Sequence, residues 1–213
     1  MSLASENYLR LHNGSAFYKK RDSNRMNVLM LAPHPFYQNR GTPIAVNLVL
    51  KVLSKRGDQV DVVTYPEGQD IHYENVNIYR IPRLPFIRKI RPGFSWKKII
   101  CDIFMFFKVI HLVATKHYDL VHAGEEAVFI GLFLKVFLKI PYVYDMDSSL
   151  AQQMVEKYPN LKFLVLLLEF FEGIAVKNAK VVVAVCDALA VDVQKYKPRN
   201  VVVIPDISLL NPN

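Results

Sequence analysis

Short apolar runs alternate along the chain with longer stretches in which apolar residues recur every three or four positions. The short runs predict buried strands, and the three-to-four spacing predicts helices that bury one face. The runs predict seven strands, over residues 27–31, 59–65, 76–81, 119–122, 142–144, 180–185 and 200–205. The stretches between them predict helices over residues 44–53, 95–116, 125–138, 148–178 and 187–196, the fourth broken around Pro159.

This alternation of strands and helices predicts the fold class. It is typical of an α/β protein with a doubly wound, mostly parallel, seven-stranded Rossmann-like sheet. Residues 26–213 are expected to form this sheet as one domain. Residues 1–25 are polar and weakly patterned, so we interpret them as an N-terminal extension without an assigned function.

The loop between the first predicted strand and helix is unusually long, at roughly ten residues where two to six are usual. Thr42 is expected to cap the helix, and Pro43 suits the first helical position, which needs no amide donor. Gly41 would let a ligand approach the backbone. Because a helix N-terminus attracts anions, the loop, which also holds Tyr37 and Arg40, predicts a phosphate site. A plain connection is the alternative.

Polar residues follow several of the predicted strands. In a doubly wound sheet, ligands bind at the carboxyl ends of the strands, so these residues are expected to line one cleft. Asp187 precedes a predicted helix and is expected to be its N-cap. The residues expected in the cleft are His34, Arg40, Gly41, Thr42, His122, Gly124, Glu125, Glu126, Asp145, Asp147, Ser148, Ser149, Cys186, Asp187 and Asp206.

The charge of the chain is uneven. The net charge is +8 with a pI near 9.4, and seven cations lie among apolar residues between positions 79 and 98. Such a segment suits anionic lipid headgroups, while a solvated basic loop is the alternative. Nucleic acid is disfavoured because no recognition motif accompanies the charge. The predicted membrane contacts are Arg83, Arg88, Lys89, Arg91, Trp96, Lys97 and Lys98.

Composition also bears on location. The chain is 52% hydrophobic with a mean hydropathy of +0.14, which indicates surfaces meant for another domain or a membrane face. The two cysteines, Cys101 and Cys186, fit no metal spacing, and without a visible signal peptide they indicate reduced thiols. Charged residues interrupt the apolar runs before they reach the length of a spanning helix. We expect a cytoplasmic protein, peripheral on the inner face of a membrane.

Several segments resemble one enzyme family in order and spacing. Residues 26–65 join a glycine before a helix, a Leu-x-x-Leu-x-x-Arg-Gly-like helix end and a Val-Asp-Val-Val-Thr strand. The likeness continues through residues 118–123, 139–145, 178–185 and 201–205. In these features the chain is similar to the retaining glycosyltransferases of family 4, which have the two-domain GT-B architecture. It departs from their usual pattern at Arg40, Gly124 and Asp206, where a second glycine, a polar residue and an asparagine are usual.

The resemblance implies roles for particular residues. Gly41 and Thr42, with Arg40, would face the diphosphate of a nucleotide sugar, and His122 would stand beside the sugar. We expect four residues on the acceptor side: Tyr37, Glu125, Asp145 and Asp147. Capping of the helix from Ser148 is the alternative role for the two aspartates. The nucleotide sugar is a co-substrate, and no metal or further cofactor is implied.

The resemblance also implies a second domain. The family's C-terminal domain, which carries most of the donor contacts, would begin where this sequence ends at Asn213. On this interpretation the 213 residues are the acceptor-binding half of a hexosyltransferase, inactive alone, whose glycan or lipid-linked acceptor is used at a membrane surface.

Two other functions remain open. Asp145 and Asp147 at a strand end are similar to the nucleophile motif of magnesium-dependent haloacid-dehalogenase-type phosphatases, although no acidic pair follows a later strand. A non-enzymatic module that docks on a membrane or a partner is the second. Magnesium-dependent release of phosphate would indicate the first, and lipid binding without nucleotide-sugar binding the second.

Overall fold

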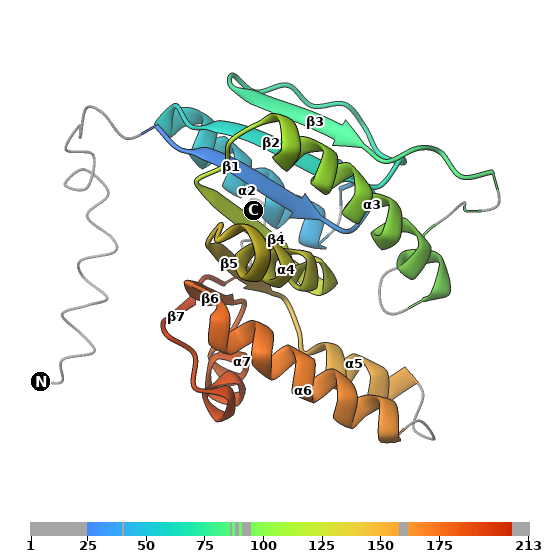
Figure 1. Cartoon of the computed structure of the whole chain (residues 1–213), viewed down its shortest axis with the longest axis vertical. Coiled ribbons are helices and arrows are strands. Elements are labelled where there is room, and N and C mark those ends of the chain that lie inside the picture. Colours follow the sequence, from blue (N-terminus) through green and yellow to red (C-terminus); the bar gives the residue numbers. More distant parts are fainter. Residues whose placement is uncertain are drawn as a thin grey trace, which may run out of the picture.

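The sheet is the centre of the fold. The computed structural model describes residues 25–39, 41–85, 87, 90, 95–157 and 162–205. Within these residues, seven strands form one sheet in the order β3-β2-β1-β4-β5-β6-β7, and every neighbouring pair is parallel (Figure 1). The strands are β1 (Asn27–Ala32), β2 (Gln59–Thr64), β3 (Val76–Arg80), β4 (Leu120–Gly124), β5 (Tyr142–Met146), β6 (Val181–Ala184) and β7 (Val201–Val203). The predicted Rossmann-like sheet is confirmed.

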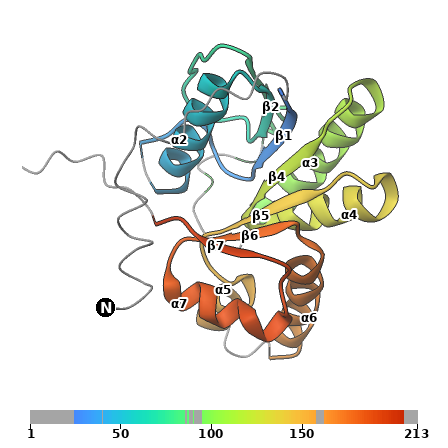
Figure 2. The same ribbon diagram turned by 90° about the vertical axis from the view of Figure 1, so that its left-hand side faces the viewer.

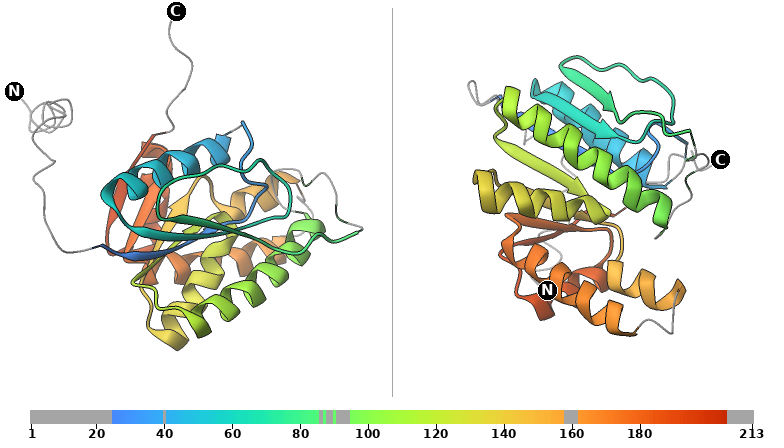
Figure 3. Two further views of the ribbon diagram at one scale, coloured as in Figure 1. Left: turned by 90° about the horizontal axis from the view of Figure 1, so that it is seen from above. Right: turned by 45° about the vertical axis from the view of Figure 1, so that its right-hand side comes forward.

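Helices cover both faces of this sheet. The helices are α2 (Gly41–Arg56), α3 (Trp96–Thr115), α4 (Val128–Leu138), α5 (Leu150–Lys157), α6 (Lys162–Asn178) and α7 (Asp187–Asp192), with single turns η1 (Glu125–Ala127) and η2 (Val193–Tyr196). Figure 2 shows α2 on the opposite side of the sheet from α3 and α4. Figure 3 shows α3, α4 and α6 side by side along one face. This division follows from right-handed crossovers. The chain adds β2 and β3 on one side of β1 and then β4 to β7 on the other side, so the connecting helices lie on opposite faces of the sheet.

Two apolar clusters follow from the alternation of side chains along the strands. Val28 and Met30 on β1 pack with Val46 and Leu50 of α2. Leu29, on the other face of β1, belongs to the larger cluster beneath α3, α4, α6 and α7. Both faces of the central strands are therefore buried, as parallel sheets require.

Several helix ends differ from the predictions. Ser95 caps α3, where its Oγ accepts a hydrogen bond from the Lys98 amide at 3.3 Å. The prediction that Thr42 caps α2 is wrong, since the helix begins one residue earlier, at Gly41. The prediction for Asp187 is also wrong: Cys186 is the N-cap, and Asp187 places its carboxylate in the first turn, near the positive end of the helix dipole.

The remaining predicted boundaries hold closely. The long helix predicted over residues 148–178 is two helices, α5 and α6, and Pro159 lies outside the described residues between them.

Within the described part of the chain, every helix is too short or too polar to span a lipid bilayer.

A buried carboxylate fastens the end of α3 to the sheet. Asp61 on β2 accepts hydrogen bonds from Tyr118 Oη at 2.6 Å, Lys116 Nζ at 2.7 Å and Asn77 Nδ2 at 2.8 Å. Burial alone would raise the pKa of the Asp61 carboxyl, but these hydrogen bonds outweigh burial and lower its pKa. Asp61 therefore stabilises the fold wherever it is ionised.

We predict that Asp61→Asn lowers the free energy of unfolding by about 2 kcal/mol at pH 7, because the buried donors lose a charged acceptor. A lowered folded-state pKa contributes stability above the unfolded pKa of about 4, and this contribution is lost as the pH falls through the folded value. Urea unfolding should therefore show the difference at pH 7 and a smaller one below about pH 4. Asp70→Asn, in the exposed pair with Arg80, is the matched control and should cost under about 1 kcal/mol. Equal losses in the two variants would contradict the prediction.

Candidate functional site

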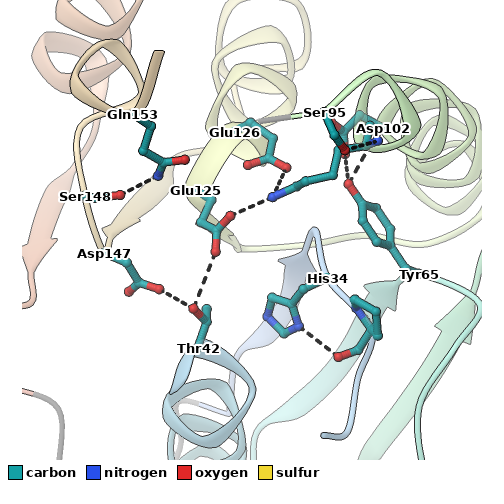
Figure 4. Close-up of polar contacts among 12 residues, drawn as sticks. His34, Thr42, Tyr65, Ser95, Asp102, Glu125, Glu126, Asp147, Ser148 and Gln153 are labelled. Atoms are coloured by element: carbon teal, nitrogen blue, oxygen red, sulfur yellow. Dashed lines mark hydrogen bonds and ion pairs between the residues drawn. The ribbon is translucent and has the colours of Figure 1, made fainter. Parts of the chain in front are cut away.

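The candidate site lies where three strand ends meet the start of a helix. The sheet is parallel, so the carboxyl ends of β1, β4 and β5 lie along the same edge. Figure 4 shows Thr42 at the start of α2 facing Glu125, which follows β4, and Asp147, which follows β5. The predicted convergence of these polar residues is present in the structure.

Thr42 connects the three segments. Its Oγ1 lies 2.6 Å from Asp147 Oδ2 and 3.4 Å from Glu125 Oε1, so the hydroxyl donates toward carboxylates instead of capping the helix. At Gly41, the space that a side chain would occupy holds no atom within 4 Å. The first turn of α2 therefore has room for a ligand beside its backbone, with carboxylates on the facing side.

A lysine between two glutamates adjoins this site. Lys98 Nζ lies 2.8 Å from Glu125 Oε2 and 2.6 Å from Glu126 Oε1, and the lysine is only 5% exposed. The prediction that Lys98 contacts a membrane is wrong, because its side chain points inward to these carboxylates. The helical periodicity of the sequence could have predicted this burial, because Lys98 shares a helix face with the buried Cys101 and Met105.

The two glutamates have opposite pKa shifts. Burial, together with the charges of Asp102 and Glu125, raises the pKa of Glu126 to about 8 against the attraction of Lys98. Burial also disfavours ionisation of Glu125, but the charge of Lys98 and its hydrogen bond outweigh it, so the pKa of Glu125 is lowered. At neutral pH the pair therefore holds a carboxylate at Glu125 and a carboxylic acid at Glu126.

The backbone at Glu125 is held in an uncommon conformation. Its φ of 43° lies in the left-handed region that favours glycine. Non-glycine residues held in such regions cost about 1–3 kcal/mol each and cluster at functional sites. The turn η1 thus directs Glu125 toward Thr42 while its neighbour Glu126 faces α3.

One buried acid near Lys98, Asp102, was not predicted from the sequence as part of the site. Tyr65 Oη donates to Asp102 Oδ1 at 2.6 Å. Burial raises the pKa of Asp102 to about 6, although Tyr65 and Lys98 act in the opposite direction. Tyr65 follows β2 and Asp102 lies on α3, so their contact depends on tertiary packing and leaves no local pattern.

His122 forms a separate pair with Asp145. The His122 Nε2 atom lies 2.9 Å from Asp145 Oδ2, and both side chains are largely buried. Both project from the α2 side of the sheet, on adjacent strands. His122 is the third residue of β4, two before the strand ends, so it lies deeper than the strand-end position expected of it.

The other predicted residues are dispersed or lie elsewhere. Tyr37 exchanges two backbone hydrogen bonds with Gln69, at 3.1 and 2.9 Å, and its ring packs against Phe36. Arg83 and Trp96 are exposed, and Lys97 is half-buried. Five predicted residues lie outside the described ones: Arg40, Arg88, Lys89, Arg91 and Asp206.

The geometry also bears on metal binding. Asp145 contacts His122, and Asp147 contacts Thr42, so the two aspartates have different partners. Among the described residues, no three His, Cys, Asp or Glu side chains are grouped to hold a metal ion.

Comparison with known proteins gives a family-level match. The family model described as Glycosyltransferase Family 4 matches residues 40–206. No curated protein matches the sequence.

Solved structures share the fold. A sucrose-phosphate synthase from Thermosynechococcus elongatus superposes with a TM-score of 0.64 at 18% identity, over 85% of this chain and 48% of the synthase. A UGT transferase from Siraitia grosvenorii in complex with UDP gives a TM-score of 0.52 at 10% identity, over 88% of this chain and 52% of the transferase. The chain thus spans about half the length of these proteins, and at such identities the likeness establishes the fold alone.

We predict that Glu126→Gln makes stability less dependent on pH. An acid whose pKa rises from about 4.3 unfolded to about 8 folded binds more protons when folded, so stability falls as the pH rises between these values. In urea unfolding, the free energy of unfolding of the unsubstituted protein should fall by about 3–4 kcal/mol between pH 5 and 8, and by less in Glu126→Gln. Glu74→Gln, an exposed substitution of the same kind, should keep the full slope. An identical slope in Glu126→Gln would refute the raised pKa.

Proposed function

The chain belongs to glycosyltransferase family 4, and we therefore propose that it is the acceptor-side half of a retaining glycosyltransferase. The complete enzyme would move a hexose from a nucleotide sugar to a glycan or lipid-linked acceptor. A second GT-B domain would supply most donor contacts, so the 213 residues alone would lack transfer activity. The observation that carries this proposal is the convergence of the α2 N-terminus with Glu125 and Asp147 at one edge of the sheet.

The two sides of the cleft suit different parts of the substrates. At the start of α2, unpaired backbone amides and the open space beside Gly41 suit the diphosphate of the donor. Opposite them, Glu125 and Asp147 offer carboxylate oxygens, which accept hydrogen bonds from sugar hydroxyls. A donor of this kind accords with the UDP bound in the Siraitia grosvenorii transferase of similar fold.

The chemistry would rest mainly on electrostatics. Negative charge develops on the departing diphosphate, and fixed amides at a helix N-terminus stabilise it without reorganisation. His122 would stand beside the transferred sugar, with Asp145 as its positioning residue. With Asp145 ionised, Nε2–H donates to the carboxylate, which leaves Nδ1 for a further hydrogen bond.

The surface near the start of α3 supports a membrane location for the acceptor. Trp96 and Ile99 are 60% and 44% exposed, and Arg83 and Lys97 lie nearby in sequence. Interleaved cations and apolar side chains suit the interface of an anionic membrane. The same surface would serve a non-enzymatic docking module, so transfer and membrane binding need separate tests. The family match favours the transferase over a phosphatase that uses Asp145 and Asp147.

We predict that His122→Ala lowers turnover about 10²- to 10³-fold while folding is retained, because a polar group beside the reacting sugar is lost. The test is a sugar-transfer assay on the chain together with its proposed donor domain. Asp145→Asn should give a smaller loss in kcat with an altered pH profile. His117→Ala, whose side chain is 81% exposed, is the matched control and should leave turnover unchanged. Full activity in His122→Ala would remove this residue from the site, and no transfer from any nucleotide sugar would refute the proposed function.

We also predict salt-sensitive binding to vesicles that contain phosphatidylserine. Each cation near such a surface contributes about 1 kcal/mol, so Arg83→Gln with Lys97→Gln should weaken binding by roughly 30-fold at low salt. A cosedimentation assay at rising salt measures this. Lys51→Gln with Lys55→Gln, on α2 across the sheet, removes the same charge and should have little effect. Vesicle binding that does not depend on salt, or an equal loss of binding in both double variants, would contradict a role for this surface.

A further inference from the structure

An apolar cavity opens between α3, α4 and the α5–α6 pair. Its volume is about 390 Å³, within the range of small-molecule sites in proteins. Its lining includes Ile99, Ile103 and Phe107 of α3, Phe129 and Ile130 of α4, and Leu168 of α6. Most of this lining is apolar, so the cavity suits an apolar group.

The inner end of the cavity is polar and adjoins the candidate site. Lys98, Asp102 and Glu126 line it. The same Lys98 ammonium contacts Glu126 in the cavity and Glu125 in the site (Figure 4). Gln153, also in the lining, donates through Nε2 to Ser148 Oγ at 2.5 Å, on the segment that carries Asp147. The inner end of the cavity therefore offers Lys98 and Glu126 to the polar head of a ligand, and the same lysine contacts Glu125 in the site.

The outer end of the cavity opens onto an apolar surface. The lining residues Ile103 and Phe107 are themselves 50% and 64% exposed, so the cavity has a mouth at α3. Trp96 and Lys97 lie in the first turn of the same helix, next to the lining residues Lys98 and Ile99, and the acidic residue of this helix is the inward-facing Asp102. The mouth is thus continuous with the surface proposed to meet anionic lipid, and its positive charge complements such a surface.

From these observations we infer that the cavity holds the aliphatic chain of an amphipathic acceptor. The polar group of this acceptor then lies at Lys98 and Glu126, beside the ion pair with Glu125, and its chain lies against Ile103, Phe107 and Ile130. The inference rests on the proposed function in that it places the acceptor of the transfer, yet chain binding itself needs neither donor nor catalysis.

The experiment measures binding of n-alkyl β-glucosides, from butyl to decyl and below their critical micelle concentrations, to the 213-residue chain by calorimetry. Each added methylene should tighten binding about fourfold until the cavity is full, since burying one methylene contributes about 0.8 kcal/mol. The stoichiometry should be one. Affinity that does not depend on chain length, or no binding of the decyl glucoside, overturns the inference.

Two phenylalanines provide a matched pair of variants. Phe107 lines the cavity and is 64% exposed, whereas Phe137 on α4 is 67% exposed and lies outside the lining. Phe107→Gln should weaken decyl glucoside binding by roughly tenfold, the contribution of one to two methylenes. Phe137→Gln should leave it unchanged. Equal weakening would indicate nonspecific adsorption to exposed apolar side chains and would overturn the inference.

The transfer assay separates this inference from the proposed function. Equal transfer to methyl and octyl glucosides would leave the transferase intact and overturn the cavity as an acceptor site. Chain-length-dependent binding without transfer to any acceptor would leave the cavity as an alkyl-chain site and refute the transferase.

Discussion

The arrangement of the site depends on one buried ammonium group. Lys98 lies between Glu125 and Glu126, and through them it fixes α3 against the turn that follows β4. Removing one partner from a buried charge pair typically costs about 3–5 kcal/mol, because the other charge stays buried without compensation. The same ion pair holds Glu125, whose backbone φ is 43°, where its other carboxylate oxygen faces Thr42 at 3.4 Å. The geometry of the cleft thus rests on charges contributed by a helix that packs on one face of the sheet.

The order of elements followed from the sequence because each strand is a short apolar run bounded by polar residues. All seven strands and the break between α5 and α6 were predicted, since parallel strands buried on both faces leave a continuous apolar signal. Thr42, Glu125 and Asp147 were also predicted to share a cleft, because strand ends in a parallel sheet lie at one edge.

The contacts that were not predicted depend on the directions in which side chains point. Lys98 was grouped with its neighbours in a basic segment, although its position on the buried face of α3 distinguishes it from the exposed Trp96. The contact between Tyr65 and Asp102 joins elements whose packing no local pattern specifies. Thr42 was expected to cap a helix, but its hydroxyl donates a hydrogen bond to the carboxylate of Asp147, which is distant in sequence.

Glu125 and Glu126 are adjacent in the chain, yet the turn η1 directs the first to the cleft and the second to the cavity. Everything beyond Glu126 on the cavity side is built from α3, α4, α5 and α6, while the cleft is built from strand ends and α2. Residues of α4, α5 and α6 can therefore differ between related proteins without disturbing the sheet edge, whereas Lys98 of α3 has to be kept. On the proposed function, acceptor recognition can therefore change on one side of this turn while the cleft on the other side is kept.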